Sequence, residues 1–195
     1  MNKKASLSLA GLLATAVCNP AQAEERHQTT GNEYEAMATN INDELVTKVN
    51  EAITKRRSEG YSCSQATLLG VCRTLGSELT EKQLKALSVG LRGGIGKTFE
   101  DGTCGALTAG VMALGLYTSE DYDKGVTLAG ELFKHFKDTY GTVKCGDIVG
   151  KYQFTRCTGC CLCMGKKVVE LLQRENVELP QVNTVTWDNA TQSKS

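Results

Sequence analysis

The chain has little of what several functional classes depend on. Its 22 Lys and Arg residues balance its 22 Asp and Glu residues, and no basic patch stands out that would suit nucleic acid. It has two histidines, His27 near the N-terminus and His135 beside the apolar face of an expected helix, where a surface side chain is a simpler interpretation than a metal ligand. Beyond residue 23 no apolar run is long enough to cross a membrane. Nucleic acid is therefore not an expected partner, and no integral membrane segment is expected after residue 23.

Two cofactor motifs are also missing. The tripeptide 96–98 (Gly-Lys-Thr) looks like the end of a phosphate-binding P-loop, but five residues separate Gly90 from Gly96 where four are needed. The residues before it have helical spacing and do not form the strand that such a loop requires. Cys161 directly follows Cys160, so there is no Cys-x-x-Cys-His motif for covalent attachment of c-type haem. Neither a nucleotide nor haem c is an expected cofactor.

The N-terminus has the features of a bacterial-type secretory signal peptide. Two lysines precede an apolar run over residues 5–17, and the small residues Ala21 and Ala23 suit signal peptidase. We therefore expect cleavage after Ala23 and an exported protein, either periplasmic or secreted. Residues 24–32 are polar and are expected to form a flexible leader, and residues 181–195 a C-terminal tail.

Residues 33–180 are predicted to form a single helical, cysteine-rich domain. Apolar residues recur every four positions from Met37 to Ile53, and helical patterns or turn signals continue over about 62–75, 80–90, 104–117, 120–140, 145–148 and 157–172. No segment alternates between apolar and polar residues for long, so we expect an all-α protein, a compact bundle of five to seven helices. In the helix over 120–140 the predicted apolar face consists of Val126, Ala129, Leu132, Phe133, Phe136 and Tyr140.

A glycine-rich loop leads into a central apolar helix within residues 90–117. Gly93, Gly94, Gly96 and Gly102 permit backbone angles and close approaches that a Cβ would forbid. Cys104 then falls in the first turn of the helix, where unpaired amide N–H groups and the helix dipole favour a thiolate. We therefore predict that the pKa of Cys104 lies below its ordinary value and that this residue is reactive or bound to a metal.

Nine cysteines are the most distinctive part of the composition, and eight remain after residue 23. Cys63, Cys104, Cys145 and the run over 157–163 lie on four expected elements, three of them near an element start, which suits a shared site. Cys72 lies in the middle of a helix on its apolar face and is predicted to be a buried structural thiol.

The cysteine-dense run CTGCCLC begins the last expected helix. Cys157 and Cys160 form a C-x-x-C motif, which can close a redox-active disulfide or offer two thiolates to a metal. Adjacent cysteines cannot easily point at one centre, so Cys160 and Cys161 are expected to have separate roles. Cys163 is predicted to point away from the apolar face, toward Lys167 and Glu170.

Taken together, these motifs resemble a known family. The matching segments are YSCSQA at 61–66, GGIG at 93–96 with CGA at 104–106, MALGL at 112–116, and Cys145 and Cys161 followed by VVELL at 168–172. From Tyr61 to Leu172 the chain is similar to the C_GCAxxG_C_C family of redox-active proteins. The resemblance implies a helical domain whose four family cysteines are redox-active or hold a metal or iron–sulfur centre. In this chain they are Cys63, Cys104, Cys145 and Cys161, with Cys157, Cys160 and Cys163 as further candidate metal ligands.

Three functions are compatible with such a cluster. The leading hypothesis is an exported redox protein, either a thiol–disulfide oxidoreductase or an electron carrier with an iron–sulfur cluster, that acts on a partner protein or a small thiol. The alternatives are a protein that binds zinc or copper(I) through thiolates and a structural or interaction domain held by inert disulfides. Disulfide chemistry fits an exported chain better than a cluster that must be assembled outside the cytoplasm. In that version Cys104 reacts, one of Cys63, Cys145 or Cys161 resolves it, and the run over 157–163 exchanges with an outside reductant.

Overall fold

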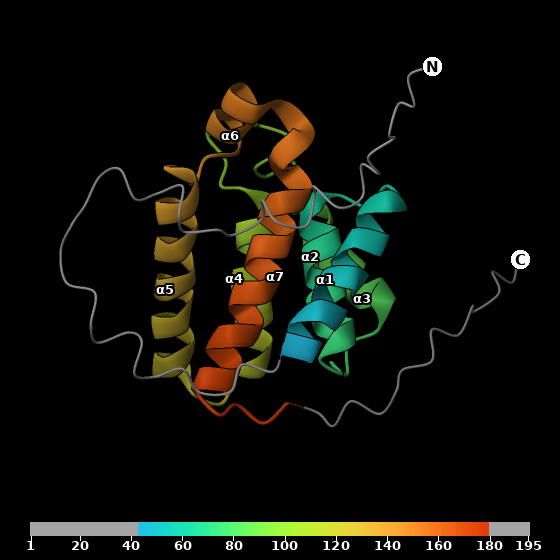
Figure 1. Ribbon diagram of the computed structural model, residues 1–195, viewed down its shortest axis with the longest axis vertical. Helices are drawn as coiled ribbons and strands as arrows, with labels where there is room; N and C mark the ends of the chain where they lie inside the picture. Colours follow the sequence, from blue (N-terminus) through green and yellow to red (C-terminus); the bar gives the residue numbers. More distant parts are fainter. Residues whose placement is uncertain (1–42, 180–195) are drawn as a thin grey trace, which may run out of the picture.

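A computed structural model describes residues 43–179, which form seven α-helices and two short 3-10 helices (Figure 1). Within this range the only β-type pairing is an isolated antiparallel bridge between Thr103 and Lys144, so the predicted all-α class is confirmed. The expected signal peptide, leader, tail and first ten residues of the first helix lie outside the described residues. The helices are α1 (Asp43–Ser58), α2 (Cys63–Thr74), α3 (Glu81–Ser88), η3 (Val89–Leu91), α4 (Gly105–Tyr117), α5 (Tyr122–Tyr140), α6 (Cys145–Tyr152), η4 (Gln153–Arg156) and α7 (Cys157–Arg174).

Local capping explains several helix boundaries. Helices α2 and α3 each begin with a capping box, in which the side chain of Ser62 or Thr80 accepts a hydrogen bond from the backbone N–H three residues later. Helix α5 ends at Gly141, whose φ of 76° places it in the left-handed region that glycine adopts without strain. These signals are local in the sequence, and the corresponding predicted boundaries agree with the structure to within about two residues, a normal margin for helix ends.

Helix α7 runs through the middle of the bundle, with α1 and α2 on one side and α4 and α5 on the other (Figure 1). Ile53 of α1 is fully buried between α2 and α7, and two glycines make room for it. A Cβ on Gly70 or on Gly165 would lie 2.4 Å from a carbon of the Ile53 side chain. The close approach of α1, α2 and α7 therefore depends on these two small residues.

Helix α5 packs at the edge of the bundle against α4 and α7. Its buried side chains are Leu128, Leu132 and Phe136, whereas Val126 is 55% and Phe133 42% exposed. The predicted apolar face was therefore wrong for Val126 and Phe133 and omitted Leu128. An edge helix covered on one side buries a narrow stripe at a spacing of four residues, and the remaining apolar side chains face outward.

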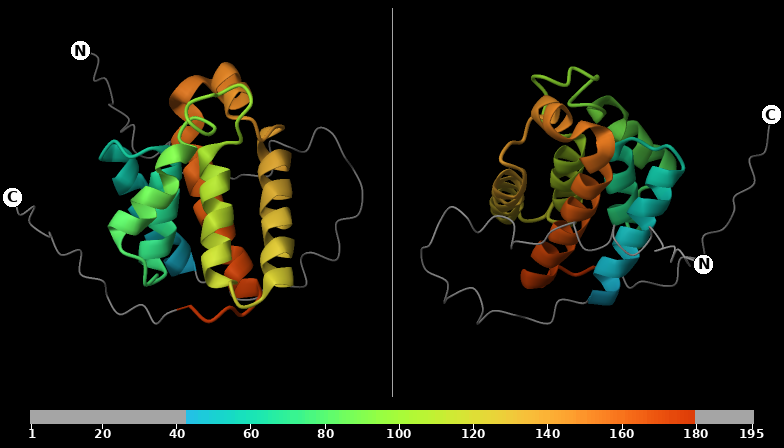
Figure 2. Two further views of the ribbon diagram at one scale, coloured as in Figure 1. Left: turned by 180° about the vertical axis from the view of Figure 1, so that it is seen from behind. Right: turned by 45° about the horizontal axis from the view of Figure 1, so that its top comes forward.

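The loop over 92–104, helix α6 and η4 lie together above one end of the bundle, beyond the start of α4 (Figure 2). The first turns of α2 and α7 are at the same end. Among the helices of residues 43–179, none is both long and apolar enough to cross a bilayer. This end of the bundle contains most of the cysteines.

Candidate functional site

The glycine-rich loop forms a left-handed turn. Five consecutive residues, 93–97, have φ between 56° and 67°, although Ile95 and Lys97 are not glycines. The backbone N–H of Lys97 donates a hydrogen bond to the Arg92 carbonyl at 2.9 Å, which closes the turn. Left-handed geometry costs an ordinary residue about 1–2 kcal/mol, so the three glycines reduce the strain of this loop.

The loop is fastened to the start of α6. The carbonyl of Gly102 accepts a hydrogen bond from the Cys145 N–H at 2.8 Å, and the Cys104 N–H donates to the carbonyl of Val143, also at 2.8 Å. Gly94 and Gly102 touch so closely that a Cβ on Gly102 would lie 1.8 Å from the Gly94 carbonyl oxygen. These contacts bring the N-termini of α4 and α6, each marked by a cysteine, next to each other.

Cys104 is the N-cap residue of α4, one position before the predicted first turn, and is only 5% exposed. The thiol of Cys160 donates a hydrogen bond to its sulfur, and the backbone N–H groups of Ala106 and Leu107 donate two more. Together they lower the pKa of Cys104 below its ordinary value of 9.0, although burial acts in the opposite direction. The predicted lowering of this pKa is confirmed, with Cys160 as a contributor that the sequence argument did not include.

Cys160 of α7 is fully buried. Its hydrogen bond to Cys104 and its burial both raise its pKa, because the proton on Cys160 stabilises the neighbouring thiolate. Within this pair the hydrogen bond therefore favours the thiolate form of Cys104 and the protonated form of Cys160. Adjacent Cys161 faces another way, and its thiol donates to the carbonyls of Cys157 at 3.0 Å and Cys63 at 3.5 Å. The two adjacent sulfurs thus contact different partners, and a difference in their roles stays a prediction.

Cys63 lies at the start of α2, half-buried, with its sulfur against the backbone of Gly105. A Cβ on Gly105 would lie 2.9 Å from that sulfur. Burial and the charge of Cys104 raise the pKa of Cys63, while backbone N–H groups of Gly93 and Ser64 oppose the increase. Cys63 and Cys104 are therefore electrostatic neighbours at the junction of α2 and α4.

The four family cysteines are all within electrostatic range of this junction. Burial, Cys104 and Cys63 raise the pKa of Cys145 to about 12. Burial raises the pKa of Cys161, and Cys63 and Cys104 add to the increase. The structure thus brings together Cys63, Cys104, Cys145 and Cys161, and adds Cys157 and Cys160 to the same group.

All eight cysteines of residues 43–179 are free thiols. In this part of the chain no group of three or more His, Cys, Asp or Glu side chains is arranged to hold a metal ion. The sulfurs as placed therefore do not fit a zinc ion or an iron–sulfur cluster, which each need several converging thiolates. Their arrangement suits chemistry between pairs of sulfurs.

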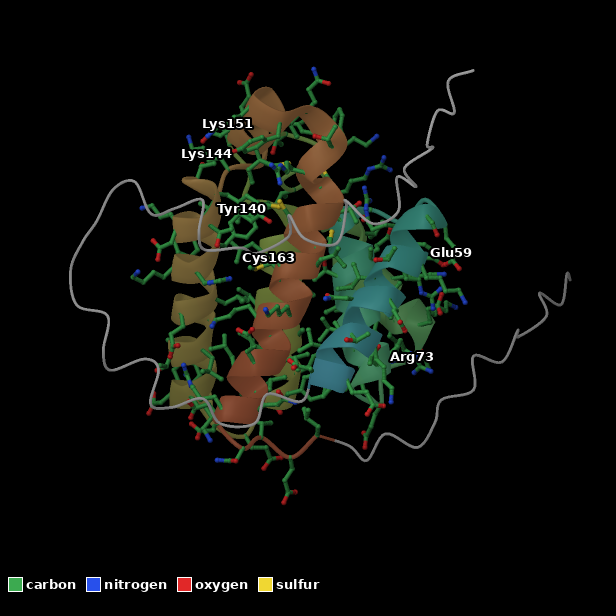
Figure 3. The ribbon with its side chains drawn as sticks, in the orientation of Figure 1. Glu59, Arg73, Tyr140, Lys144, Lys151 and Cys163 are labelled. Atoms are coloured by element: carbon green, nitrogen blue, oxygen red, sulfur yellow. The ribbon has the colours of Figure 1, made fainter. Side chains whose placement is uncertain are left out.

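Two cysteines lie apart from the group. Cys163 lies between α5 and α7 (Figure 3) and is fully buried. Its sulfur lies 3.6 Å from Nε2 of His135 on α5. Cys163 lies on the same side of α7 as Lys167, which was the predicted direction, and it is buried there because α5 packs on that side. Cys72 is a buried thiol, as predicted, and burial raises its pKa to about 12.

A pocket of about 400 Å³ opens beside the group. Three cysteines, Cys63, Cys145 and Cys157, contribute to its wall. The other side chains that line it are aromatic, cationic or small and include Tyr61, Phe99, Phe154, Arg57, Arg92 and Lys97. Cys63 and Cys157 are half-buried, so both residues are partly accessible from this pocket.

Residues 61–174 match the family described as "Putative redox-active protein (C_GCAxxG_C_C)". The chain belongs to the C_GCAxxG_C_C family. The matched segment of this C_GCAxxG_C_C protein runs from the residue before the α2 cap to the end of α7, and so contains the whole sulfur group. No curated protein and no solved structure matches the chain.

The cationic and aromatic side chains of the pocket in the C_GCAxxG_C_C protein were not predicted from the sequence. Arg57 lies in the last turn of α1, Arg92 and Lys97 come from the loop, and Phe154 belongs to η4. No local motif connects residues from such distant segments. Helical spacing could have indicated Cys160, because it lies three residues after Cys157 and four before Met164 of the predicted buried stripe.

Proposed function

We propose that the protein carries out thiol–disulfide exchange, with Cys63 and Cys104 as the exchanging pair. The observation that supports this most directly is the contrast between the two sulfurs. Cys104 is a buried sulfur with three hydrogen-bond donors that lower its pKa, and the neighbouring Cys63 lines a pocket. A thiolate is the nucleophile in disulfide exchange, whereas a thiol is inert.

The reaction begins at the accessible sulfur. Cys63 loses its proton and attacks one sulfur of a substrate disulfide, and the substrate thiolate that leaves takes up that proton. The Cys104 thiolate then attacks the Cys63 sulfur of the mixed disulfide and expels the second substrate sulfur as a thiolate. The products are a Cys63–Cys104 disulfide and two reduced substrate sulfurs, so two electrons pass from the protein to the substrate. An external thiol drives the same steps in reverse.

The surrounding residues support each step. Arg57 favours the thiolate form of Cys63, and so do the N–H groups of Gly93 and Ser64. The hydrogen bond from Cys160 favours the thiolate form of Cys104, which is the form that the second step requires. Because Gly105 has no side chain, the Cys63 sulfur can rest directly against the start of α4.

We also propose that the protein works outside the cytoplasm. The lysines, apolar run and small residues of 1–23 support export, and thiol–disulfide chemistry suits that compartment. Purified mature protein should begin at Glu24, which N-terminal sequencing can establish. A mature chain that retains Met1 would contradict export through this segment.

The exchange is tested with a small neutral disulfide, bis(2-hydroxyethyl) disulfide. The reduced protein should release two thiols per chain, and peptide mapping should find Cys63 joined to Cys104. Cys104→Ser should stop at the mixed disulfide on Cys63, whereas Cys72→Ser should behave as wild type because Cys72 lies on the far part of α2. Wild-type turnover in Cys104→Ser, or a first adduct on Cys157 that persists in Cys63→Ser, would refute this pair.

A redox titration separates exchange from inert bridges. A working pair should equilibrate with a glutathione buffer, whereas structural disulfides of secreted proteins lie below about −300 mV and resist it. If the Cys63–Cys104 disulfide forms and the glutathione buffer cannot reduce it, the bond is a structural disulfide and the exchange proposal fails.

A further inference from the structure

The pocket beside Cys63 is positively charged. Its lining contains Arg57, Arg92 and Lys97 and no Asp or Glu. Within the described residues none of these three cations forms an ion pair. Arg57 is fixed by neutral acceptors instead, with Nη1 2.5 Å from the carbonyl of Tyr61 and Nε 3.4 Å from Oγ1 of Thr158.

The left-handed turn sets the position of the other two cations. Its closing hydrogen bond joins the backbones of Arg92 and Lys97, so the two residues lie side by side on the loop. Both are exposed at the pocket, and Phe99, whose N–H donates to the Gly93 carbonyl at 2.9 Å, supplies an apolar wall beside them. The Phe99 ring meets Phe154 edge to face, with centroids 6.3 Å apart.

The lining thus combines three features in one cavity: accessible sulfurs, apolar ring surface and unpaired positive charge. Ligand pockets commonly show such an apolar wall with a few placed polar groups, and at about 400 Å³ this one has room for a small molecule. A charge of one sign in a cleft concentrates ligands of the opposite sign. The chemistry that matches all three features is a short disulfide or thiol that ends in carboxylates.

We propose that the substrate of the Cys63–Cys104 pair is a low-molecular-weight disulfide that carries carboxylates, bound with those carboxylates toward Arg57, Arg92 and Lys97. This inference rests on the proposed exchange reaction. The carboxylated disulfide receives the two electrons of the dithiol, its S–S bond breaks, and two carboxylated thiols leave the pocket. A proton from Cys63 accompanies one of them.

Three small disulfides of similar length test the charge preference. They are 3,3′-dithiodipropionate, which is dianionic, bis(2-hydroxyethyl) disulfide, which is neutral, and cystamine, which is dicationic. The rate of oxidation of the reduced protein at low ionic strength should be at least about tenfold higher with the dianion than with the dication. The difference should shrink at high salt, because these cations are exposed to screening.

Variants that each remove one positive charge test which side chains cause the preference for the dianionic disulfide. Arg92→Gln and Lys97→Gln should each slow oxidation by the dianion about two- to fivefold more than oxidation by the neutral disulfide. Lys48→Gln, which removes an exposed cation from the opposite half of α1, is the matched control and should change neither rate. Equal rates for the three disulfides in wild type, or an undiminished preference in the Arg92→Gln, Lys97→Gln double variant, would overturn the inference while leaving exchange itself intact.

A non-reactive probe keeps the two proposals separate. Suberate resembles dithiodipropionate with both sulfurs replaced by methylene groups. It should bind wild type, detected by chemical-shift changes of the loop amides, and should bind the double variant several-fold more weakly. If no disulfide is exchanged but suberate binds, the exchange reaction fails and the anion pocket stands. If suberate does not bind, the assignment of carboxylates to this pocket is wrong.

Discussion

Replacing Cys160 should change the pKa of a different residue, Cys104. The Cys160 thiol is the largest of the influences that lower that pKa, ahead of the two backbone N–H groups. A hydrogen bond to a charged group is worth about 1.5–3 kcal/mol, and a thiol is a weak donor, so the lower end applies. At about 1.4 kcal/mol per pKa unit, Cys160→Ala should raise the pKa of Cys104 by about one unit. Cys160→Ser, which keeps a donor, should leave the pKa at or below its wild-type value.

The assay is the ultraviolet absorbance of thiolate in the reduced protein as pH increases. Cys104→Ser identifies the transition that belongs to Cys104, and Cys72→Ala serves as a buried-cysteine control that should leave it in place. An unchanged transition in Cys160→Ala would show that the N-terminus of α4 alone sets the pKa. A wild-type protein without any thiolate titrating below pH 9.0 would refute the whole assignment.

Three further predictions concern stability. Gly102→Ala should lower the unfolding free energy by at least about 2 kcal/mol in denaturant titrations, because its Cβ would meet the Gly94 carbonyl, whereas Gly150→Ala meets nothing and should be neutral or stabilising. Cys72→Ser should cost about 1–2 kcal/mol and leave exchange rates unchanged, and an equal loss of exchange would contradict its structural role. In the reduced protein, Cys72 and Cys145 have folded-state pKa values raised to about 12, so their contribution is present below pH 9.0 and lost as pH rises from there toward 12. Unfolding free energy should therefore fall over that window, and a rise there would refute both assignments, because the lowered pKa of Cys104 affects stability only below pH 9.0.

Local signals in the sequence accounted for most of the secondary structure. Short segments of the sequence are enough to specify three of these features, without any distant partner. They are the capping box at Thr80, the glycine that ends α5 after Tyr140, and the apolar stripe of α7. The effect of the α4 N-terminus on the pKa of Cys104 is local in the same way, because the free backbone N–H groups belong to the helix wherever it lies.

Contacts between elements were not predictable in the same way. The buried side of α5 depends on where α4 and α7 lie, and the burial of Cys163 depends on α5. The bond from Cys160 to Cys104 joins two helices more than fifty residues apart in the chain, and no periodicity encodes such a pair. The same applies to the pocket cations, which come from α1 and from a loop whose left-handed course only the three-dimensional structure displays.

The depth of Cys104 has a consequence for chemical durability. A sulfur that stays ionised is open to peroxide, and successive oxygen additions beyond the first are irreversible in most proteins. Only 5% of the Cys104 surface is accessible, so peroxide in solution has little direct access to this sulfur. In the proposed exchange Cys104 is oxidised to a disulfide with Cys63, a state that a thiol can undo. Burial should therefore protect Cys104 from irreversible oxidation over many catalytic cycles.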